Sequence, residues 1–495
     1  MNTPINWKIS QAVFLILLGL VFLSHFPFLE ADPDRNMSVG RGPFTDEGLN
    51  TIQIRNWVNQ GDLSLTECDN LLKTPLFGFP LALSFKIFGT THSVARLHVL
   101  VLLFLALLWI GLNKKNAFMM TIFLLISLLQ YTIFQSSHFR MAEMLSIAAI
   151  LFSIHFFTLS SEPGNDRKSN DRCSILSGLF LSLSYFIKIQ FIYIIMLIPV
   201  ILAIRWFTTN FYIRKMMLRQ GLLMTGTLLF FLLVYLLAWY LPNKEAYDYM
   251  MAHQSGEFKL SNKVWEYIRF NLDYHFLKGW NQWFVYGFLI LVVSGFKFMK
   301  TNHSTHFNVW FLSSLAWFVI ELHKITMVYL PTRYQVSLFV SMGLLMSIVL
   351  SEFITSNSGR WKIVLKTVAV SLVIFFSAIN MINYSDTYRH RSYAIRDVNQ
   401  YLARNLDKND LVLGAWAPSL TRDSRAKAIP VWNDFLNYRD PLIKFKPEAI
   451  ISEIDEQDSE QAWKSQGIFL REMADSSKTA RIGQWDVVIW WLPYL

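Results

Sequence analysis

The stretch GLLMTGTLLFFLLVYLLAWYL (221–241) decides the fold, because it carries no charged residue over its whole length. About 20 consecutive apolar residues cross the hydrocarbon core of a bilayer as a helix, which pairs all its backbone polar groups internally. Similar runs occur at 11–23 and 99–112. Only 16% of the 495 residues are charged, whereas soluble domains carry about a quarter. The sequence therefore predicts a polytopic membrane protein.

Apolar runs of sufficient length predict about eleven membrane-spanning helices, and a count of twelve or thirteen stays open. The expected spans are 10–28, 93–112, 117–135, 141–160, 174–190, 191–207, 221–241, 283–299, 307–328, 334–354 and 362–381. The run 74–89 has only 16 residues and contains two prolines. We therefore expect it to form a helix in the membrane interface rather than a span.

The loops between these spans alternate in charge. Every second loop is basic, namely 113–116, 162–172, 205–220, 297–303 and 356–362. Basic loops are retained in the cytoplasm, so the N-terminus is expected inside, most simply of a bacterial cytoplasmic membrane. The long loops 29–92 and 242–282 and the C-terminal tail are then expected outside. These loops also account for the net charge of +10, so nucleic acid is not an expected partner.

The tail 384–495 differs in composition from the rest of the chain. Its segment YAIRDVNQYLARNLDKND (393–410) has apolar residues at helical spacing, and LVLGAW (411–416) and DVVIWWL (486–492) are typical of buried strands. The sequence therefore predicts a membrane module at 1–383 and a small soluble α/β domain at 384–495 on the outer side. There is no internal repeat at a fixed period, which argues against inverted-repeat transporters.

Two adjacent acids, Asp46 and Glu47, lie in the outer-loop stretch GPFTDEGLNTIQIRNWVNQGDL (42–63). Apolar residues from Leu49 onward predict a short helix, which the two acids open and which ends near Gly61. On this basis Asp46 is the N-cap and Glu47 a first-turn acid, and both stabilise the helix. The same position also keeps a carboxylate ionised and pointed out of the helix, as a general base for a hydroxyl acceptor requires. Both interpretations stay open at this point.

The order of motifs in this loop resembles the first outer loop of polytopic glycosyltransferases of the C superfamily. The motifs are TDEG (45–48), QGDL (60–63) and KTPLFGFPLALSFKIFGTTHSVARL (73–97). The protein O-mannosyltransferases and the lipid A aminoarabinose transferases are the groups that it resembles most. In the layout of residues 10–350, the segments SSHFRMAE (136–143), GLFLSLSYFIK (178–188) and PTRYQ (331–335) also fit.

The resemblance implies an enzyme that moves a sugar from a polyprenyl-phosphate donor to a protein, lipid or glycan acceptor on the outer side. It implies that Asp46 deprotonates or orients the acceptor and that Glu47 supports it, and we expect Glu143 to be a further catalytic acid. The departing phosphate needs positively charged groups and hydrogen-bond donors near the membrane surface. The residues expected to bind it are Lys73, Arg140, Lys188, Arg333 and Tyr334.

Several of these residues also have a structural interpretation. Lys188 can extend to the lipid headgroups, Arg333 can anchor a helix at the interface, and Arg140 can pair with Glu143 one turn later. In the aminoarabinose transferases an acid precedes the lysine that matches Lys73, whereas this chain has leucine there. We therefore predict no metal site built on that acid and no zinc site, and a loosely held divalent ion stays open.

Two functions compete with the glycosyltransferase. One is a transporter or flippase of a lipid-linked glycan, and the other is a non-catalytic subunit of a glycan-assembly complex. A transporter needs polar or interrupted helices that meet near the bilayer centre. The expected spans are mostly uninterrupted and their charges lie near the outer ends, which favours an enzyme at the interface.

Overall fold

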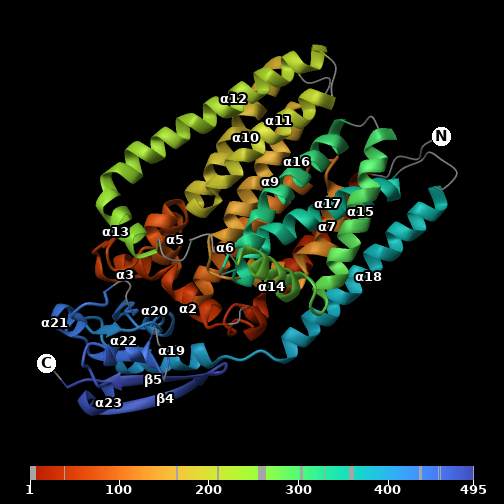
Figure 1. The fold of residues 1–495 in the computed structure, drawn as a ribbon. Coiled ribbons are helices and arrows are strands. Elements are labelled where there is room, and N and C mark those ends of the chain that lie inside the picture. The colour runs from red at the N-terminus through yellow and green to blue at the C-terminus, as the bar shows by residue number, and fades with distance from the viewer. Residues whose placement is uncertain are drawn as a thin grey trace.

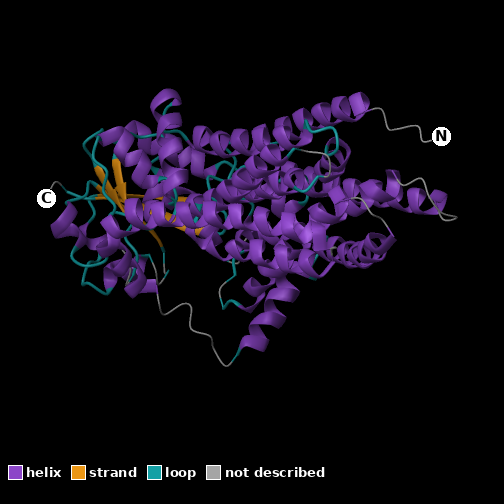
Figure 2. Cartoon of the chain, turned by 90° about the horizontal axis from the view of Figure 1, so that it is seen from above, coloured by secondary structure: helices purple, strands orange, loops and turns teal. Residues whose placement is uncertain are grey.

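The protein is a bundle of long helices with a small β-sheet at one end, as the computed structural model shows (Figure 1). The structure describes residues 7–37, 40–162, 166–208, 211–254, 263–301, 305–328, 330–355, 362–433, 437–454, 456 and 459–493. Seen from above, the strands lie at the end marked C, and the N-terminus lies at the opposite end (Figure 2).

A long helix lies at each expected span except 117–135. The long helices are α1 (Trp7–Ser24), α6 (His92–Gly111), α9 (Glu143–Ser160), α10 (Arg167–Ile187), α11 (Leu197–Thr208), α12 (Phe211–Tyr235), α15 (Asn281–Thr301), α16 (Thr305–Glu321), α17 (Val336–Thr355) and α18 (Lys362–Arg389). By length and composition, six helices of the described residues can cross a membrane, or up to eight if each of two bent pairs is one span. The expected count was about eleven, and part of the difference is that α11 and α16 have only 12 and 17 residues. The prediction of an integral membrane protein is confirmed.

The expected span 117–135 is not continuous, contrary to the prediction. It consists of α7 (Ala117–Phe123), a π-helical turn η3 (Leu124–Leu128) and α8 (Tyr131–Ser137), and α8 is bent by 96° from the preceding part. The break follows from Gln130, whose side chain caps α8 by accepting the N–H of Ile133 at 3.1 Å. Gln130 also donates to Asn281 Oδ1 at 2.8 Å, which joins this bend to a second one of 101° between α14 (Val264–Phe276) and α15.

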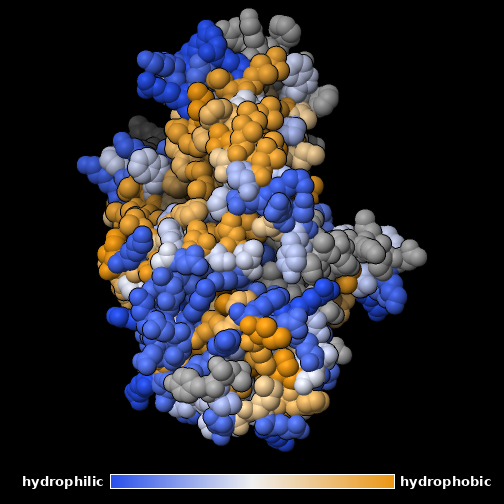
Figure 3. All heavy atoms as spheres, turned by 90° about the vertical axis from the view of Figure 1, so that its left-hand side faces the viewer, coloured by the Kyte–Doolittle hydropathy of each residue, from blue (hydrophilic) through white to orange (hydrophobic). Residues whose placement is uncertain are grey.

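The outer surface of the bundle is apolar. Helices α9 and α17 are buried on nearly all sides, whereas α12 and α18 carry exposed large hydrophobic residues, for example Leu222, Phe230, Ile363 and Ile374. Figure 3 shows a band of hydrophobic side chains in the upper part of one face, below a hydrophilic cluster at its top end, and a mixture of hydrophilic and hydrophobic side chains over the lower half. Such a surface fits contact with lipid chains, because a large exposed apolar area is unfavourable in water.

The loops gather at two ends of the bundle, as the charge pattern predicts. At one end, Lys114 lies 4.1 Å from the ring centre of Trp7, and Lys115 pairs with Glu162 at 2.7 Å. Glu162 is also 3.0 Å from His306 Nδ1. These contacts bring together α1, the loop 113–116, the segment that follows α9 and the start of α16. The basic segment 356–361 lies outside the described residues.

The C-terminal sheet has five strands in the order β2-β1-β3-β5-β4. The strands are β1 (Leu411–Leu413), β2 (Lys427–Ile429), β3 (Ala449–Glu453), β4 (Ser476–Ile482) and β5 (Trp485–Trp491). β1 pairs in parallel with β2 and β3, whereas β5 is antiparallel to β3 and β4. The predicted helix is α19 (Ala394–Asn405), which buries its apolar stripe. The helix and the two predicted strands are confirmed.

The first outer loop packs on this sheet. Its helices are α2 (Gly42–Leu49), α3 (Ile52–Gln60), α4 (Asn70–Lys73) and α5 (Pro75–Phe88), and the last is the expected helix at 74–89. Arg55 of α3 is fully buried and donates to the carbonyl groups of Thr421, Ser424 and Ala426 at 2.5 to 2.8 Å. The loop 29–92 and the tail therefore form one unit at the end of the bundle opposite to the basic loops. The loop 242–282 contributes α13 (Lys244–Gln254) and α14.

Candidate active site

The acid pair lies inside α2 rather than at its start, so the prediction that Asp46 is an N-cap is wrong. The helix begins at Gly42 because Pro43 occupies its first turn, where the fixed φ of proline favours helix initiation. Gly61 ends α3 with a φ of 84°, as predicted. Successive residues of a helix point about 100° apart. Asp46 and Glu47 therefore face different surroundings.

Asp46 forms an ion pair with Arg333, which lies in the short helix η8 (Thr332–Gln335). The Asp46 side chain is 20% exposed, and that of Arg333 is 4% exposed. A Cβ atom added at Gly42 would lie 2.8 Å from Arg333 Nη1. Glycine at position 42 thus leaves room for the guanidinium beside α2, and the carboxylate stays accessible from one side.

A second ion pair lies beside the first. Glu143, the first residue of α9, pairs with Lys188, the residue that follows α10. Both side chains are nearly buried. The ring of Tyr334 joins the two pairs, because its centre lies 5.2 Å from Lys188 Nζ and 4.9 Å from Arg333 Cζ.

Lys73 at the end of α4 completes this group. It pairs with Asp69, and it is close enough to Asp46 for its positive charge to lower the pKa of that carboxyl group slightly. The structure thus brings together six of the eight residues expected at the site, and we call this group the Asp46 site. Its members are Asp46, Lys73, Glu143, Lys188, Arg333 and Tyr334.

The pKa of Asp46 is raised above its ordinary value. Burial is the largest cause, and the neighbouring carboxylate of Glu143 adds to it, while Arg333 and Lys188 oppose it. Burial raises the pKa because it penalises the charged form of a carboxyl group. Once ionised, a carboxylate with a raised pKa is a stronger base than an ordinary aspartate. Asp46 therefore has the electrostatic setting that proton abstraction requires.

Glu47 lies in a different and fully buried group. Arg96 holds both of its oxygens, with Nε at 3.0 Å from Oε1 and Nη2 at 2.6 Å from Oε2, and the backbone N–H of Arg140 donates to Oε1 at 2.9 Å. Burial would raise the pKa of Glu47, but Arg96 and Arg140 outweigh it and hold the pKa below its ordinary value. We call these residues the Glu47 cluster. Glu47 is thus fixed as an anion with no exposed atom.

Arg140 belongs to this second cluster and not to the Asp46 site. Its Nε lies 3.6 Å from Glu47 Oε1, so the pairing of Arg140 with Glu143 does not occur. The reason is that Arg140 lies in the turn before α9, where the spacing of a helical turn does not apply. Sequence reasoning missed Arg96, although an arginine among apolar residues at the start of α6 is a signal of a buried partner.

A third ion pair adjoins the Asp46 site, and its acid, Glu321, was missed. Glu321 at the end of α16 pairs with Lys324 at 2.6 Å and accepts from Tyr193 at 2.9 Å. Lys324 also donates to the carbonyl of Tyr334 at 3.0 Å. Among the residues that the structure describes, no three histidine, cysteine or acidic side chains come together as metal ligands. A loosely held divalent ion stays a prediction.

The fold defines a class, namely mainly helical polytopic membrane proteins with a small C-terminal sheet. The chain is similar to ArnT from Cupriavidus metallidurans, solved in the apo state (TM-score 0.64) and bound to undecaprenyl phosphate (TM-score 0.61). In both comparisons the identity is 13%, and 97% of each chain is covered.

The chain is also similar to the archaeal oligosaccharyltransferase AglB from Archaeoglobus fulgidus, solved in complex with an inhibitory peptide and a dolichol-phosphate. That TM-score is 0.51 at 10% identity, over 89% of this chain and 69% of the other. No model of a known protein family matches the sequence, and no curated protein matches it. At such low identity the likeness concerns the fold, and in the fold it confirms the resemblance drawn from the sequence.

Proposed function

We propose that the protein is a membrane glycosyltransferase that moves a sugar from a polyprenyl-phosphate carrier to an acceptor. The reaction takes place at the end of the bundle that carries the C-terminal sheet. This end is the outer face, most simply of a bacterial cytoplasmic membrane, because the basic loops lie at the opposite end. The similarity in fold to a structure that binds undecaprenyl phosphate supports the choice of donor.

The observation that carries this proposal is the Asp46 site itself. It places two cations, Lys188 and Arg333, around one tyrosine ring, with a partly accessible carboxylate of raised pKa beside them. Lys and Arg are suited to hold a phosphate oxygen, and burial strengthens their effect. The carboxylate is suited to the opposite task, which is to take a proton from a hydroxyl group.

In the proposed step, the acceptor hydroxyl gives its proton to Asp46, and its oxygen bonds to the anomeric carbon of the donor sugar. The bond between that carbon and the carrier phosphate breaks, and the phosphate leaves with the electron pair. Lys188 and Arg333, with Lys73 and Tyr334 close by, stabilise the charge that develops on it. Glu143 keeps Lys188 in place. Glu47 does not contact the substrates but holds α2 in place through its buried contacts. Arg140 contributes to these contacts and does not bind the phosphate.

The experiment is replacement of Asp46 by Asn in a strain that lacks the chromosomal copy, with analysis of its lipid-linked sugars and envelope glycans. Loss of a general base typically lowers turnover about 10²–10⁴-fold. We expect such a loss, while the purified variant still binds undecaprenyl phosphate. The matched control is Asp62→Asn, which alters an exposed acid of the same loop and leaves turnover unchanged.

Unchanged turnover in Asp46→Asn contradicts the proposal and favours a non-catalytic subunit. A transporter or flippase would give a third result. In the strain that lacks the protein, the lipid-linked sugar would accumulate on the inner face, and the glycosidic bonds of the envelope glycans would still be formed by other enzymes wherever donor reaches the outer face. Analysis of both leaflets in the same strain therefore separates the three functions.

A further inference from the structure

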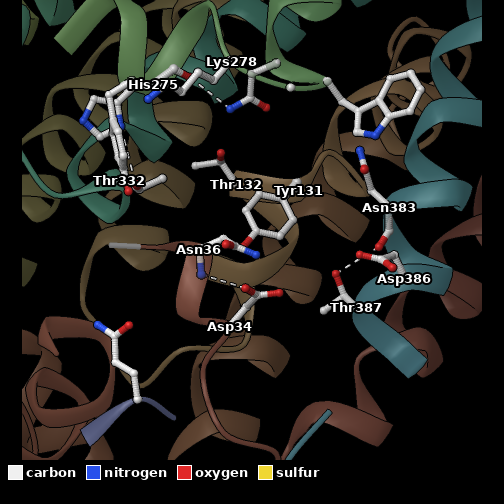
Figure 4. A pocket seen from close by; sticks show the side chains of 15 residues that line it. Asp34, Asn36, Tyr131, Thr132, His275, Lys278, Thr332, Asn383, Asp386 and Thr387 are labelled. Carbon is white, nitrogen blue, oxygen red and sulfur yellow. Dashed lines mark hydrogen bonds between the residues drawn. The ribbon is translucent and has the colours of Figure 1, made fainter. Parts of the chain in front are cut away.

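A polar groove lies next to the Asp46 site, at the junction of the helix bundle and the C-terminal sheet (Figure 4). It has two lobes with cavity volumes of about 670 and 620 Å³. The lobes are continuous, because both are lined by residues 34 and 36, by the end of α18 and by the β4–β5 turn. Each volume falls in the range of about 300–1,000 Å³ typical of ligand sites, which are common at domain interfaces.

The described residues that line the larger lobe include no aliphatic side chain. Apart from one glycine, they are acids, amides, hydroxyl-bearing residues, a lysine, a histidine and aromatic residues. Asp34, Asp386, Asn383 and Thr387 face the same space, and Lys278 and His275 lie on its opposite wall (Figure 4). Ligand pockets are usually lined mainly by apolar groups, so this lining is unusual.

Two buried polar groups of the groove lack a protein partner. Thr132 Oγ1 and Gln135 Nε2 make no hydrogen bond within the described part of the chain, although their residues are 0% and 1% exposed. Thr132 lines the larger lobe and points toward its middle (Figure 4), and Gln135 lines the smaller one. More than nine in ten buried polar groups are normally paired, because leaving one unpaired costs free energy. Such groups are therefore available to a polar ligand.

We propose that the polar groove binds a saccharide portion of the acceptor substrate. The inference rests on the proposed function and assigns the acceptor, which the sequence left as protein, lipid or glycan, to the glycans. Carboxylates and amides can pair with neighbouring hydroxyl groups of a sugar ring, and Tyr131, Tyr274 and Trp280 offer flat faces for its C–H groups. No aliphatic residue is among the described residues that line the larger lobe, which disfavours an acyl chain or an apolar peptide side chain.

Two short helices, α2 and η8, contribute residues both to the groove and to the Asp46 site. Thr332 lines the larger lobe, and the next residue, Arg333, pairs with Asp46. Phe44 lines the smaller lobe and lies in α2 with Asp46. The short helices α2 and η8 therefore separate the groove from the cations of the Asp46 site.

The test measures binding of the purified full-length protein to immobilised trisaccharides of glucose, mannose, galactose and N-acetylglucosamine. Undecaprenyl phosphate, a palmitoyl phospholipid and an unstructured peptide serve as further probes. Thr132→Val removes a hydroxyl that has no partner in the protein, so its thermal stability should match that of the wild type. We expect Trp280→Ala and Thr132→Val each to bind at least one trisaccharide about tenfold more weakly, a loss of about 1.4 kcal/mol.

The matched control is Trp265→Ala, which removes an exposed tryptophan of α14 that does not line the groove and should bind like the wild type. All groove variants should bind undecaprenyl phosphate normally. If no trisaccharide binds, if the groove variants bind as well as the wild type, or if the phospholipid or peptide competes at these residues, the inference is overturned. Asp46→Asn should retain trisaccharide binding, so failure of the catalytic proposal and failure of the groove proposal give different results.

Discussion

Asp46 and Glu47 are neighbours in α2, yet the regions around them differ in almost every physical property. The Asp46 site retains access to solvent and contains two ion pairs around one tyrosine ring. The Glu47 cluster is closed, and Arg96 and the Arg140 backbone occupy both carboxylate oxygens. The pKa is raised at the first acid and lowered at the second. One acid is therefore available for chemistry, while the other holds the helix in place.

The largest effect is expected for Glu47→Gln. This change leaves Arg96 buried without its counter-charge, and breaking a buried pair in this way costs about 3–5 kcal/mol of stability. We expect a much lower midpoint of thermal unfolding in detergent. The measurement is the fraction of folded protein that size-exclusion chromatography detects after heating to each temperature. Asp62→Asn is the matched control, because it changes an exposed acid of the same loop and should leave the midpoint nearly unchanged.

The sign of the pH dependence follows from the lowered pKa of Glu47. The pair contributes its full stability above the unfolded-state pKa of glutamate and loses it as the pH falls through the lower folded-state pKa. The difference in stability between wild type and Glu47→Gln should therefore shrink in acid. Equal stability of the two proteins at neutral pH contradicts the assignment of a structural role to Glu47.

The next effect is expected for Gly48→Ala, which tests how firmly α2 is attached to the C-terminal unit. A Cβ atom at position 48 would lie 2.5 Å from the backbone N of Ser419 and 2.6 Å from the carbonyl carbon of Pro418. Backbone atoms cannot move aside as a flexible side chain can, and overpacking costs about 1–3 kcal/mol. We expect a lower unfolding midpoint together with reduced turnover.

Gly226→Ala is the control for this change, because nothing lies within 4 Å of a Cβ atom at that position in α12. Alanine also has a higher helix propensity than glycine, so this variant should be as stable as the wild type or slightly more stable. A Gly48→Ala protein that behaves like Gly226→Ala would show that α2 does not need its close contact with the C-terminal unit.

The contrast between the two acids could be predicted only in part. The long apolar runs predicted the helices and the loop charges predicted their grouping, because both depend on composition within one segment. The surroundings of Asp46 and Glu47 depend on partners far away in the chain, such as Arg333 and Arg96. No local spacing encodes such a pairing. Pro43, by contrast, is a local signal that was overlooked, and α2 starts about one turn earlier than the apolar pattern indicated.

The double variant Glu143→Gln/Lys188→Gln tests the proposal that the Asp46 site binds the carrier phosphate. Replacing both members leaves no buried charge unpaired, so the loss of stability should be small. Loss of one charge-assisted contact to phosphate should weaken binding of undecaprenyl phosphate about tenfold, which corresponds to about 1.4 kcal/mol. The matched control is Asp171→Asn/Arg219→Gln, an ion pair at the opposite end of the bundle. Equal weakening in both double variants would contradict the assignment.

The smallest effect is expected for Gly42→Ala, which sharpens the comparison within α2 itself. The added Cβ atom would lie 2.8 Å from Arg333 Nη1, but this neighbour is the far end of a flexible side chain rather than a backbone atom. Arg333 can shift by a few tenths of an ångström, so the fold should be nearly unaffected. The shift moves Arg333 within the Asp46 site. We therefore expect a few-fold weaker affinity for undecaprenyl phosphate with an unchanged unfolding midpoint. Gly42→Ala and Gly48→Ala thus make the same chemical change six residues apart and should separate binding from stability. A Gly42→Ala protein that loses stability but binds undecaprenyl phosphate normally would show that Arg333 stabilises the fold and does not bind the donor.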